Sequence, residues 1–386
     1  MNNIFLEKKG KIMKKLLIFH PALAPYRIDQ FNALSKLYDL EVVFVYDNVW
    51  NHKFNQSKLL PLLKFKYSFL LKGLSNNGRV FRFGMHRKIR KTNPDIILGF
   101  EYSLTTQYLI LLKRLGLIHQ RIGSTVDDSI DICHNVQSRG RYIVRKWSVN
   151  CLDYFVVLSN EVSEYYQQTF GLKKEQIIVS PILQEPDRLR NNPEKLESIA
   201  KKYQQEYHLN GKKVLLFVGR FIPEKALPRF ISTIASLLHE HEDLVFVLVG
   251  DGQERGPIEN LVRNKSLENK VLLPGRFEGE ELFAWYLCAS CFTLPSLSET
   301  FGAVVNEALI FGLPVFCSKY AGASSLIQSH NGVVFDPLNE KTTIEKLNHF
   351  LGCTENFDEI DITNRPSLML DYKEVFIKEW RKLVYA

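Results

Sequence analysis

Residues 291–322 constrain this chain more than any other segment. The apolar run Cys291–Leu294 predicts a buried strand. From Ala303 the apolar residues follow helical spacing, and Gly312 with Pro314 ends that pattern before a second apolar run. The order strand, loop, helix, strand predicts a unit of a parallel α/β sheet.

Two carboxylates in this segment stand at positions suited to a ligand. We expect Glu299 on the loop after the strand and Glu307 just over one turn into the helix. Ligands of open α/β sheets bind at that edge, and free amides near Phe301 and Gly302 suit a phosphate. One carboxylate on each side of that phosphate could accept hydrogen bonds from hydroxyls. A nucleotide-sugar has hydroxyls on both sides of its diphosphate. The alternative is a pair of glutamates on a helix surface.

The same segment resembles the donor site of the retaining glycosyltransferases of family 4, also called group 1. Their Glu-x7-Glu motif matches Glu299 to Glu307, including the Phe-Gly that follows the first glutamate. The resemblance implies the GT-B fold, an α/β architecture of two Rossmann-like, doubly wound parallel-sheet domains facing across a cleft. It also implies that Glu299 faces the donor sugar and that Glu307 binds the ribose.

A second motif follows the apolar run 214–218. The sequence Gly219-Arg220-Phe-Ile-Pro-Glu-Lys225 resembles the family's Gly-Arg-x4-Lys loop, whose Arg and Lys hold the donor diphosphate. Negative charge builds on the leaving diphosphate when the glycosidic bond breaks, and fixed cations stabilise it. An ordinary solvated loop is the alternative interpretation.

Two further turns complete the predicted donor site. The run 245–249 ends in Gly-Asp251-Gly252, which fits a tight turn near a nucleotide but lacks the third glycine of a dinucleotide fingerprint. A turn after another short strand contains Arg276 and Phe277. In the family this turn lies near the nucleobase, so the resemblance places one of these two side chains there.

The N-terminal half matches the family less closely. A proline-containing loop leads from the first strand to Arg27, which could reach a phosphate or an acceptor, or could be an ordinary surface arginine. After a later strand, Asp127 stands where many relatives have an active-site His. Asp127 or Asp128 could accept sugar hydroxyls, whereas His134 is out of register and is interpreted as non-functional.

Length and composition fit two domains of ordinary size in 386 residues, of which 45% are hydrophobic. A helical apolar pattern near the end predicts a last helix that returns to the first domain, as in GT-B enzymes. Its residues are Tyr372, Val375, Phe376, Trp380, Leu383 and Val384. The predicted parts are a disordered extension (1–12), an acceptor domain (13–186), a connection (187–211), a donor domain (212–365) and the returning helix (366–386).

We expect neither a cofactor nor a metal. Asp127, Asp128 and Asp131 could suggest a divalent cation, but GT-B relatives generally use side-chain cations instead. The six cysteines are interpreted as reduced thiols, because the single Cys288-x-x-Cys291 has no matching pair. The start of the chain has no apolar core for a signal peptide and Met13 resembles an initiator, so we expect a cytoplasmic protein.

The net charge of +8 is concentrated in one stretch. Between Asp47 and Asp95 there is no Asp or Glu, and aromatic and aliphatic residues lie among the cations. The cations are Lys53, Lys58, Lys64, Lys66, Lys72, Arg79, Arg82, Arg87, Lys88, Arg90 and Lys91. This pattern favours an anionic membrane face, on the inner side of the cell membrane, over nucleic acid, for which no motif is present. A basic surface around ordinary core strands is the other alternative.

The sequence therefore predicts a glycosyltransferase that moves a sugar, with retention, from a nucleotide-diphosphate-sugar to a glycan or lipid-linked acceptor in bacterial surface polysaccharide synthesis. Two alternatives remain. One is a sugar-nucleotide epimerase of the same architecture, whose acid and base would have to be Asp127 or Asp128. The other is a non-catalytic sugar-nucleotide-binding subunit, which the missing His makes conceivable.

Overall fold

The computed structural model describes residues 13–49, 53–76, 79–135, 138–182, 184–354, 360–371 and 373–385. The predicted extension at residues 1–12 lies outside this range. The chain forms two compact units. Unit 1 contains residues 1–127, 136–183 and 372–386, and unit 2 contains residues 128–135 and 184–371. Within the described ranges, no helix combines the length and apolarity needed to cross a bilayer.

Unit 1 is built on a seven-stranded sheet in the order β3-β2-β1-β6-β7-β8-β9, and all its strand pairs are parallel. The strands are β1 (Lys15–His20), β2 (Asp39–Phe44), β3 (Lys66–Phe69), β6 (Ile96–Phe100), β7 (Arg121–Thr125), β8 (Tyr154–Val157) and β9 (Ile177–Val179). The central strands are buried because helices cover both faces of a parallel sheet.

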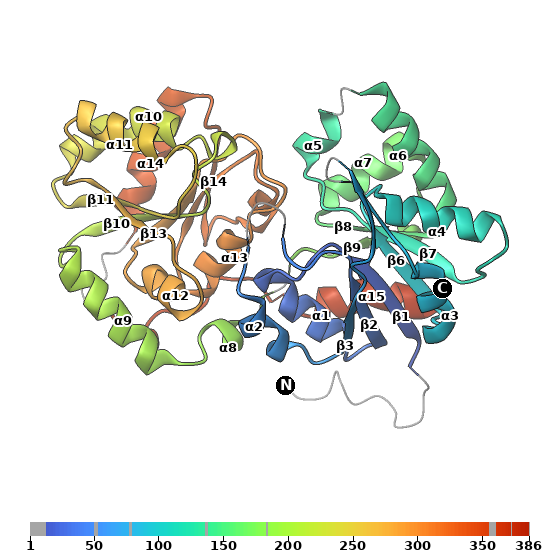
Figure 1. Cartoon of the computed structure of the whole chain (residues 1–386). Coiled ribbons are helices and arrows are strands. Elements are labelled where there is room, and N and C mark those ends of the chain that lie inside the picture. The colour runs from blue at the N-terminus through green and yellow to red at the C-terminus, as the bar shows by residue number, and fades with distance from the viewer. Residues whose placement is uncertain are drawn as a thin grey trace. The chain divides into compact units, whose positions relative to one another are not determined.

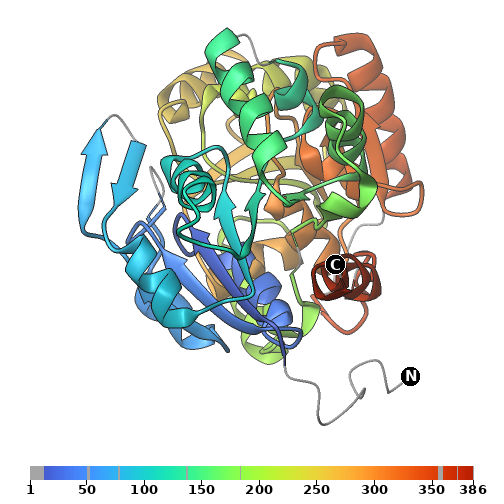
Figure 2. The same cartoon turned by 90° about the vertical axis from the view of Figure 1, so that its right-hand side faces the viewer.

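Connections between neighbouring parallel strands are right-handed. The β1–α1–β2 and β6–α4–β7 connections run in opposite directions along the sheet, so α1 (Ile28–Leu34) and α4 (Leu104–Arg114) cover opposite faces (Figure 1). The helices of unit 1 are η1 (Pro25–Arg27), α1 (Ile28–Leu34), α2 (Gln56–Leu59), η2 (Leu60–Leu62), α3 (Met85–Thr92), α4 (Leu104–Arg114), α6 (Arg139–Cys151), α7 (Asn160–Phe170), η3 (Lys174–Gln176) and α15 (Lys373–Tyr385). A separate antiparallel hairpin, β4 (Gly73–Asn76) with β5 (Arg79–Arg82), projects from the unit (Figure 2).

The last helix, α15, belongs to unit 1 and packs against β9. Phe376, Trp380 and Leu383 are at most 2% exposed and join the core cluster that also holds Phe31 of α1. Val375 was predicted on the same apolar face, but it is 51% exposed, because its position on the helix lies outside the buried stripe. Tyr372 lies outside the described residues.

Unit 2 has a six-stranded, wholly parallel sheet in the order β12-β11-β10-β13-β14-β15. Its strands are β10 (Lys213–Val218), β11 (Leu244–Val249), β12 (Val271–Gly275), β13 (Cys291–Leu294), β14 (Val315–Ser318) and β15 (Gly332–Phe335). Its helices are α5 (Ile130–His134), α8 (Pro186–Leu189), α9 (Pro193–Glu206), η4 (Pro223–Lys225), α10 (Leu227–Glu240), α11 (Arg255–Asn264), α12 (Glu280–Leu287), α13 (Ala303–Ile310), η5 (Gly322–Leu326) and α14 (Glu340–Cys353).

Each sheet reverses its strand order at one point. In unit 1 this switch point lies between β1 and β6, and in unit 2 it lies between β10 and β13. Ligands of doubly wound sheets bind outside the carboxyl ends of the strands at such a point. The two parallel sheets with covering helices confirm the predicted α/β class.

Candidate active site

The loops that follow β10 and β13 meet at the switch point of unit 2. Lys225, at the end of the first loop, forms an ion pair with Glu299 on the second. Their side chains are only 12% and 18% exposed. The two loops are also joined through the backbone, where Leu297 N–H donates to the Glu224 carbonyl at 2.8 Å. The structure therefore brings together two predicted site residues that are 74 positions apart.

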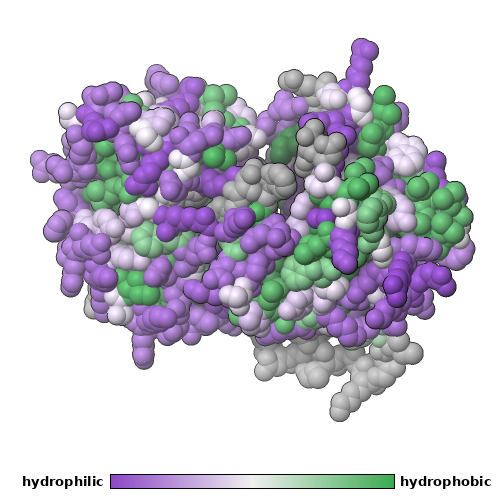
Figure 3. Space-filling model, viewed as in Figure 1, coloured by the Kyte–Doolittle hydropathy of each residue, from purple (hydrophilic) through white to green (hydrophobic). Residues whose placement is uncertain are grey.

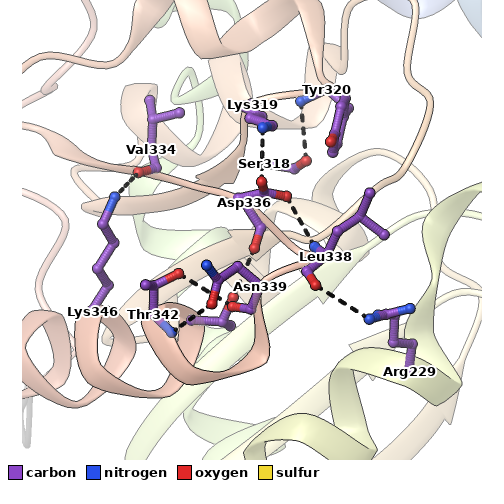
Figure 4. Close-up of polar contacts among 11 residues, drawn as sticks. Arg229, Ser318, Lys319, Tyr320, Val334, Asp336, Leu338, Asn339, Thr342 and Lys346 are labelled. Atoms are coloured by element: carbon purple, nitrogen blue, oxygen red, sulfur yellow. Dashed lines mark hydrogen bonds and ion pairs between the residues drawn. The ribbon is translucent and has the colours of Figure 1, made fainter.

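The backbone around Glu299 is held by the segment after β14. Glu299 N–H donates to the Tyr320 carbonyl at 3.2 Å, and Gly322 N–H donates to the Glu299 carbonyl at 3.1 Å. That segment is itself anchored, because Lys319 forms a 2.7 Å ion pair with Asp336 and Tyr320 N–H donates to Ser318 Oγ at 3.1 Å (Figure 4). The position of Glu299 thus depends on β14 and β15 as well as on its own loop.

Gly302 turns the chain from this loop into α13. Its φ is +94°, and a Cβ at this position would lie 2.7 Å from Leu294 Cδ2 and 3.4 Å from Glu299 Cγ. Phe301, just before it, is 2% exposed and accepts a hydrogen bond from Ala323 N–H. The first amides of α13 consequently begin beside Glu299, where the partial positive charge of a helix N-terminus suits an anion.

Glu307 lies on the fifth residue of α13, as predicted, but it is only 8% exposed. It accepts hydrogen bonds from Tyr286 Oη at 2.8 Å and Gln184 Nε2 at 3.2 Å. Burial raises the pKa of Glu307, and these two hydrogen bonds and the charge of Arg188 offset part of that shift. The alternative of two glutamates on a helix surface is therefore wrong, because neither side chain is exposed.

The glycine turns after β10 and β11 interlock. A Cβ on Gly250 would lie 1.8 Å from the Gly219 carbonyl oxygen, and one on Gly252 would lie 2.4 Å from the Phe221 carbonyl oxygen. Phe221 N–H donates to the Asp251 carbonyl at 2.9 Å.

Arg220 stands on the outer side of these turns with an exposed side chain. Asp251 is also exposed, and its Oδ1 accepts a hydrogen bond from the neighbouring Gly252 N–H at 2.8 Å. Glycine at the interlocked positions allows the two turns to approach, and it leaves Arg220 and Asp251 at the carboxyl edge of the sheet.

The turn after β12 separates its two predicted residues. Arg276 is exposed and forms an ion pair with Glu278. The Phe277 ring packs against both Tyr203 and Trp285, with ring centroids 5.5 and 5.7 Å away, and those two rings are stacked on each other at 4.5 Å. Of the two, only Arg276 lies open to a ligand in this conformation.

Unit 1 has a cavity of about 410 Å³ at its own switch point. Arg27 is 5% exposed there and pairs with Asp127, whose side chain is 38% exposed. The interpretation of Arg27 as a surface arginine is therefore wrong. Burial alone would raise the pKa of Asp127, but the charge of Arg27 and its hydrogen bond hold it below its usual range.

Among the lining residues that sequence reasoning missed, two stand at the ends of central strands. His20 ends β1 and Glu101 follows β6, the two strands that flank the switch point. Glu101 has a φ of +49° and accepts a hydrogen bond from Asp127 N–H at 2.9 Å. The sequence contains a signal for His20 and Glu101, because each is a polar residue directly after an apolar run that predicts a strand.

Asp128 and His134 lie outside the group that lines this cavity. Asp128 is 5% exposed and belongs to the segment that is grouped with unit 2, and His134 is exposed. Within the described ranges, no group of three or more His, Cys, Asp or Glu side chains is arranged to hold a metal ion.

Residues 199–362 match the family model "Glycosyl transferases group 1". The 2-deoxystreptamine N-acetyl-D-glucosaminyltransferase of Niallia circulans is 31% identical over 162 residues, a match that spans 42% of either chain and so less than half of that relative. A second relative, from Campylobacter jejuni, is 26% identical over 92% of both chains. It is named GalNAc-alpha-(1->4)-GalNAc-alpha-(1->3)-diNAcBac-PP-undecaprenol alpha-1,4-N-acetyl-D-galactosaminyltransferase.

Solved structures share the fold over nearly the whole chain. The HepE protein of Anabaena in complex with UDP has a TM-score of 0.68 at 17% identity and covers 97% of this chain and 100% of its own. The lipopolysaccharide outer core galactosyltransferase WaaB has a TM-score of 0.64 at 17% identity and covers 96% and 99%. The predicted GT-B fold is confirmed.

Proposed function

We propose that the chain is a retaining hexosyltransferase of the group 1 glycosyltransferases, whose family model matches residues 199–362. It moves a sugar from a nucleotide-diphosphate-sugar to a glycan or lipid-linked acceptor, in the synthesis of a bacterial surface polysaccharide. The observation that carries this proposal is the ion pair of Lys225 and Glu299 beside the start of α13.

The pair has the properties of a donor site without its ligand. A cation and a carboxylate that are both mostly buried must neutralise each other, because an unpaired buried charge is costly. A diphosphate would compete for Lys225, and the released Glu299 would then accept hydroxyl hydrogen bonds from the sugar. Both side chains keep a partner in the bound and the free state.

The chemistry needs charge stabilisation more than a protein nucleophile. The bond between the anomeric carbon and the diphosphate oxygen breaks, and the acceptor oxygen bonds to that carbon on the same face. The departing phosphate oxygen takes the proton of the acceptor hydroxyl. Lys225, Arg220 and the first amides of α13 stabilise the diphosphate charge, while Glu307 holds the ribose.

The cavity of unit 1 supports an acceptor site. Glu101 and Asp127 supply carboxylate oxygens for sugar hydroxyls, and Tyr26 and Tyr46 supply aromatic rings in the same lining. The name of the Campylobacter relative contains a polyprenol-diphosphate-linked glycan, so a lipid-linked acceptor is the first to test. UDP-sugars are the first donors to test, because the HepE structures include complexes with UDP and UDP-glucose.

We also propose contact between residues 53–91 and the inner face of an anionic membrane. Three of the eleven cations there serve unit 1 itself, since Lys66 pairs with Asp39, Lys88 pairs with Glu41, and Arg82 Nε donates to the Val45 carbonyl at 2.7 Å. The eight others all have exposed side chains, namely Lys53, Lys58, Lys64, Lys72, Arg79, Arg87, Arg90 and Lys91.

The decisive experiment measures nucleoside diphosphate release from a panel of nucleotide-sugars with a membrane lipid extract. Lys225→Ala and Arg220→Ala should each lower kcat/KM by about a hundredfold or more, the usual effect of one lost transition-state charge contact. Glu299→Gln should chiefly lower kcat. Glu307→Ala should weaken donor binding by roughly 1.5–3 kcal/mol, the worth of a hydrogen bond to a charged acceptor.

Lys202→Ala is the matched control, because this exposed lysine of α9 lies on none of the site loops. Near-normal rates in the Lys225 and Glu299 variants would remove the pair from the mechanism. Conversion of the donor without any acceptor would indicate an epimerase instead. Donor binding without turnover under every condition would indicate a binding subunit.

A further inference from the structure

Exposed apolar side chains are concentrated on unit 1. Of the seventeen large hydrophobic residues that are exposed in the described part of the chain, sixteen belong to unit 1 and only Leu338 belongs to unit 2. The densest group is on α6, where Tyr142, Ile143, Val144 and Trp147 are 37–65% exposed. A contiguous apolar patch of this kind marks an interaction surface more often than an ordinary protein surface.

The α6 helix buries polar residues against the unit and exposes large apolar ones, the reverse of an ordinary surface helix. Two of its three buried residues, Arg145 and Ser148, are polar, and only Val149 is apolar. Ser148 Oγ accepts a hydrogen bond from Gln107 Nε2 at 2.8 Å, and the Arg145 guanidinium lies 5.1 Å from the centroid of the Tyr102 ring. Its outer face exposes Ile143 to 65%. Arg145, Ser148 and Val149 thus hold α6 to unit 1, and its other large apolar side chains are exposed.

The apolar face is surrounded by cations. Arg139, Arg141 and Lys146 of α6 have exposed side chains. Neither residues 102–126 nor residues 132–152 contain a single Asp or Glu. The exposed carboxylates beside α6 are on α7, which contacts it and carries Glu161 and Glu164.

The patch continues from α6 across α4 to the β4–β5 hairpin. Arg114 of α4 lies 5.1 Å from the Trp147 ring centroid, and on the other side Tyr108 packs edge-on against Phe81 of the hairpin at 5.1 Å. In Figure 2, α4 and α6 face the viewer, and the hairpin projects from the left edge of the unit. Figure 3 shows apolar side chains gathered at the right-hand edge of the unit, over the end of α4.

We propose that the outer face of α6 and the end of α4 insert into the headgroup region of an anionic lipid bilayer. Aromatic and aliphatic side chains enter the acyl boundary there while Lys and Arg contact the lipid charges. A second copy of this chain fits less well, because two such cationic faces would repel each other. This surface lies outside residues 53–91 and adds to the membrane contact proposed above. Its binding to lipid requires neither a sugar donor nor turnover.

Vesicle binding tests this surface directly. The full chain is sedimented with phosphatidylglycerol-containing vesicles and with pure phosphatidylcholine vesicles at low salt. We expect the wild type to bind the anionic vesicles, and the triple change Arg139→Glu, Arg141→Glu and Lys146→Glu to lower partitioning at least tenfold. Ile143→Asp should do the same while all three cations stay in place and the net charge falls by only one unit, because a carboxylate does not enter the acyl boundary.

Matched controls separate this surface from other effects. The triple change Lys202→Glu, Arg263→Glu and Lys341→Glu makes the same charge difference on exposed residues of unit 2 and should leave partitioning unchanged. Reversal of Arg87, Arg90 and Lys91 reports on residues 53–91 separately. Turnover of a soluble acceptor by the α6 variants should remain at the wild-type rate, so that loss of binding and loss of catalysis can be distinguished.

Three outcomes would overturn the proposal. The wild type could ignore anionic vesicles, the α6 variants could bind as tightly as the wild type, or the unit 2 control could lose as much binding as the α6 variant. A concentration-dependent dimer that Ile143→Asp dissociates would assign this face to a second copy of the chain instead.

Discussion

At the scale of single residues, His20, Arg27 and Asp127 determine one another's charge in the unit 1 cavity. His20 is 8% exposed, and its ring packs edge-on against Phe31 with centroids 5.1 Å apart. Burial and the charge of Arg27 lower the pKa of His20 to about 3, although Asp127 acts in the opposite direction. His20 is therefore neutral throughout the physiological pH range.

The neutral state of His20 predicts an acid-sensitive unit 1. The unfolded chain binds a proton at this residue below a pKa of about 6.5, whereas the folded chain does so only near pH 3. The contribution of neutral His20 to the free energy of unfolding is fully present above pH 6.5 and is lost as pH falls toward 3. Between pH 7 and pH 5 the loss should be about 2 kcal/mol in the free energy of unfolding.

Urea unfolding of wild type and His20→Gln at both pH values measures this loss. The other titrating groups are shared by the two proteins, so the difference between their pH dependences isolates His20. His119→Gln is the control. If His20→Gln loses as much stability as the wild type on acidification, His20 is not neutral in the folded chain.

The residues that sequence predicted best are those whose role is local. Gly302 precedes a helix that begins at the expected residue, and Glu307 lies on that helix where predicted. The burial of Arg27 was not predictable, because its partner Asp127 is a hundred residues away and no local pattern encodes their contact. The packing of Phe277 against Tyr203 and Trp285 was missed for the same reason.

At the scale of elements, the strands were predictable because buried parallel strands are continuous apolar runs. The predicted strand Cys291–Leu294 matches β13, and the run 214–218 matches β10 except for its first residue. The burial of Arg145 and Ser148 on the inner face of α6 was not predictable, because the apolar residues of the helix follow helical spacing whichever side they face. Only the tertiary contacts decide which side is buried.

The interlocked turns after β10 and β11 give a prediction at this scale. Gly250→Ala places a Cβ within 1.8 Å of the Gly219 carbonyl oxygen, a backbone atom that cannot rotate away. The free energy of unfolding of unit 2 should fall by about 3 kcal/mol, and donor binding should weaken because the Arg220 loop moves. Thermal unfolding and donor titration measure the two effects.

Gly256 of α11 is the matched control, since nothing lies within 4 Å of a Cβ added there. Gly256→Ala should raise stability by about 0.5–1 kcal/mol, because alanine loses less conformational entropy in a helix. Equal stability of the two alanine variants would show that the turns are not tightly packed.

At the scale of the whole molecule, the first and last α-helices described, α1 and α15, are linked in unit 1. Trp380 Nε1–H of α15 donates to Ser180 Oγ at 2.9 Å, and Gln30 Nε2–H donates to the same oxygen at 3.1 Å. Gln30 Oε1 in turn accepts a hydrogen bond from Arg27 at 2.8 Å. The last helix is thus connected to the arginine of the unit 1 cavity through three side chains, a link that the pattern of apolar residues in α15 could not reveal.

This link predicts that the last helix supports both the stability and the proposed acceptor site of unit 1. Trp380→Ala should lower the free energy of unfolding of unit 1 by 3–5 kcal/mol, because the side chain is 1% exposed and its removal leaves a cavity. Trp380→Phe keeps most of the packing but removes the N–H donor, so it should raise the KM for the acceptor more than it lowers stability.

Val375→Ala, at a position that is 51% exposed on the same helix, is the control and should change neither quantity. Calorimetry and acceptor kinetics on the full chain measure both effects. An unchanged acceptor KM in Trp380→Phe would mean that Arg27 is held by Asp127 alone.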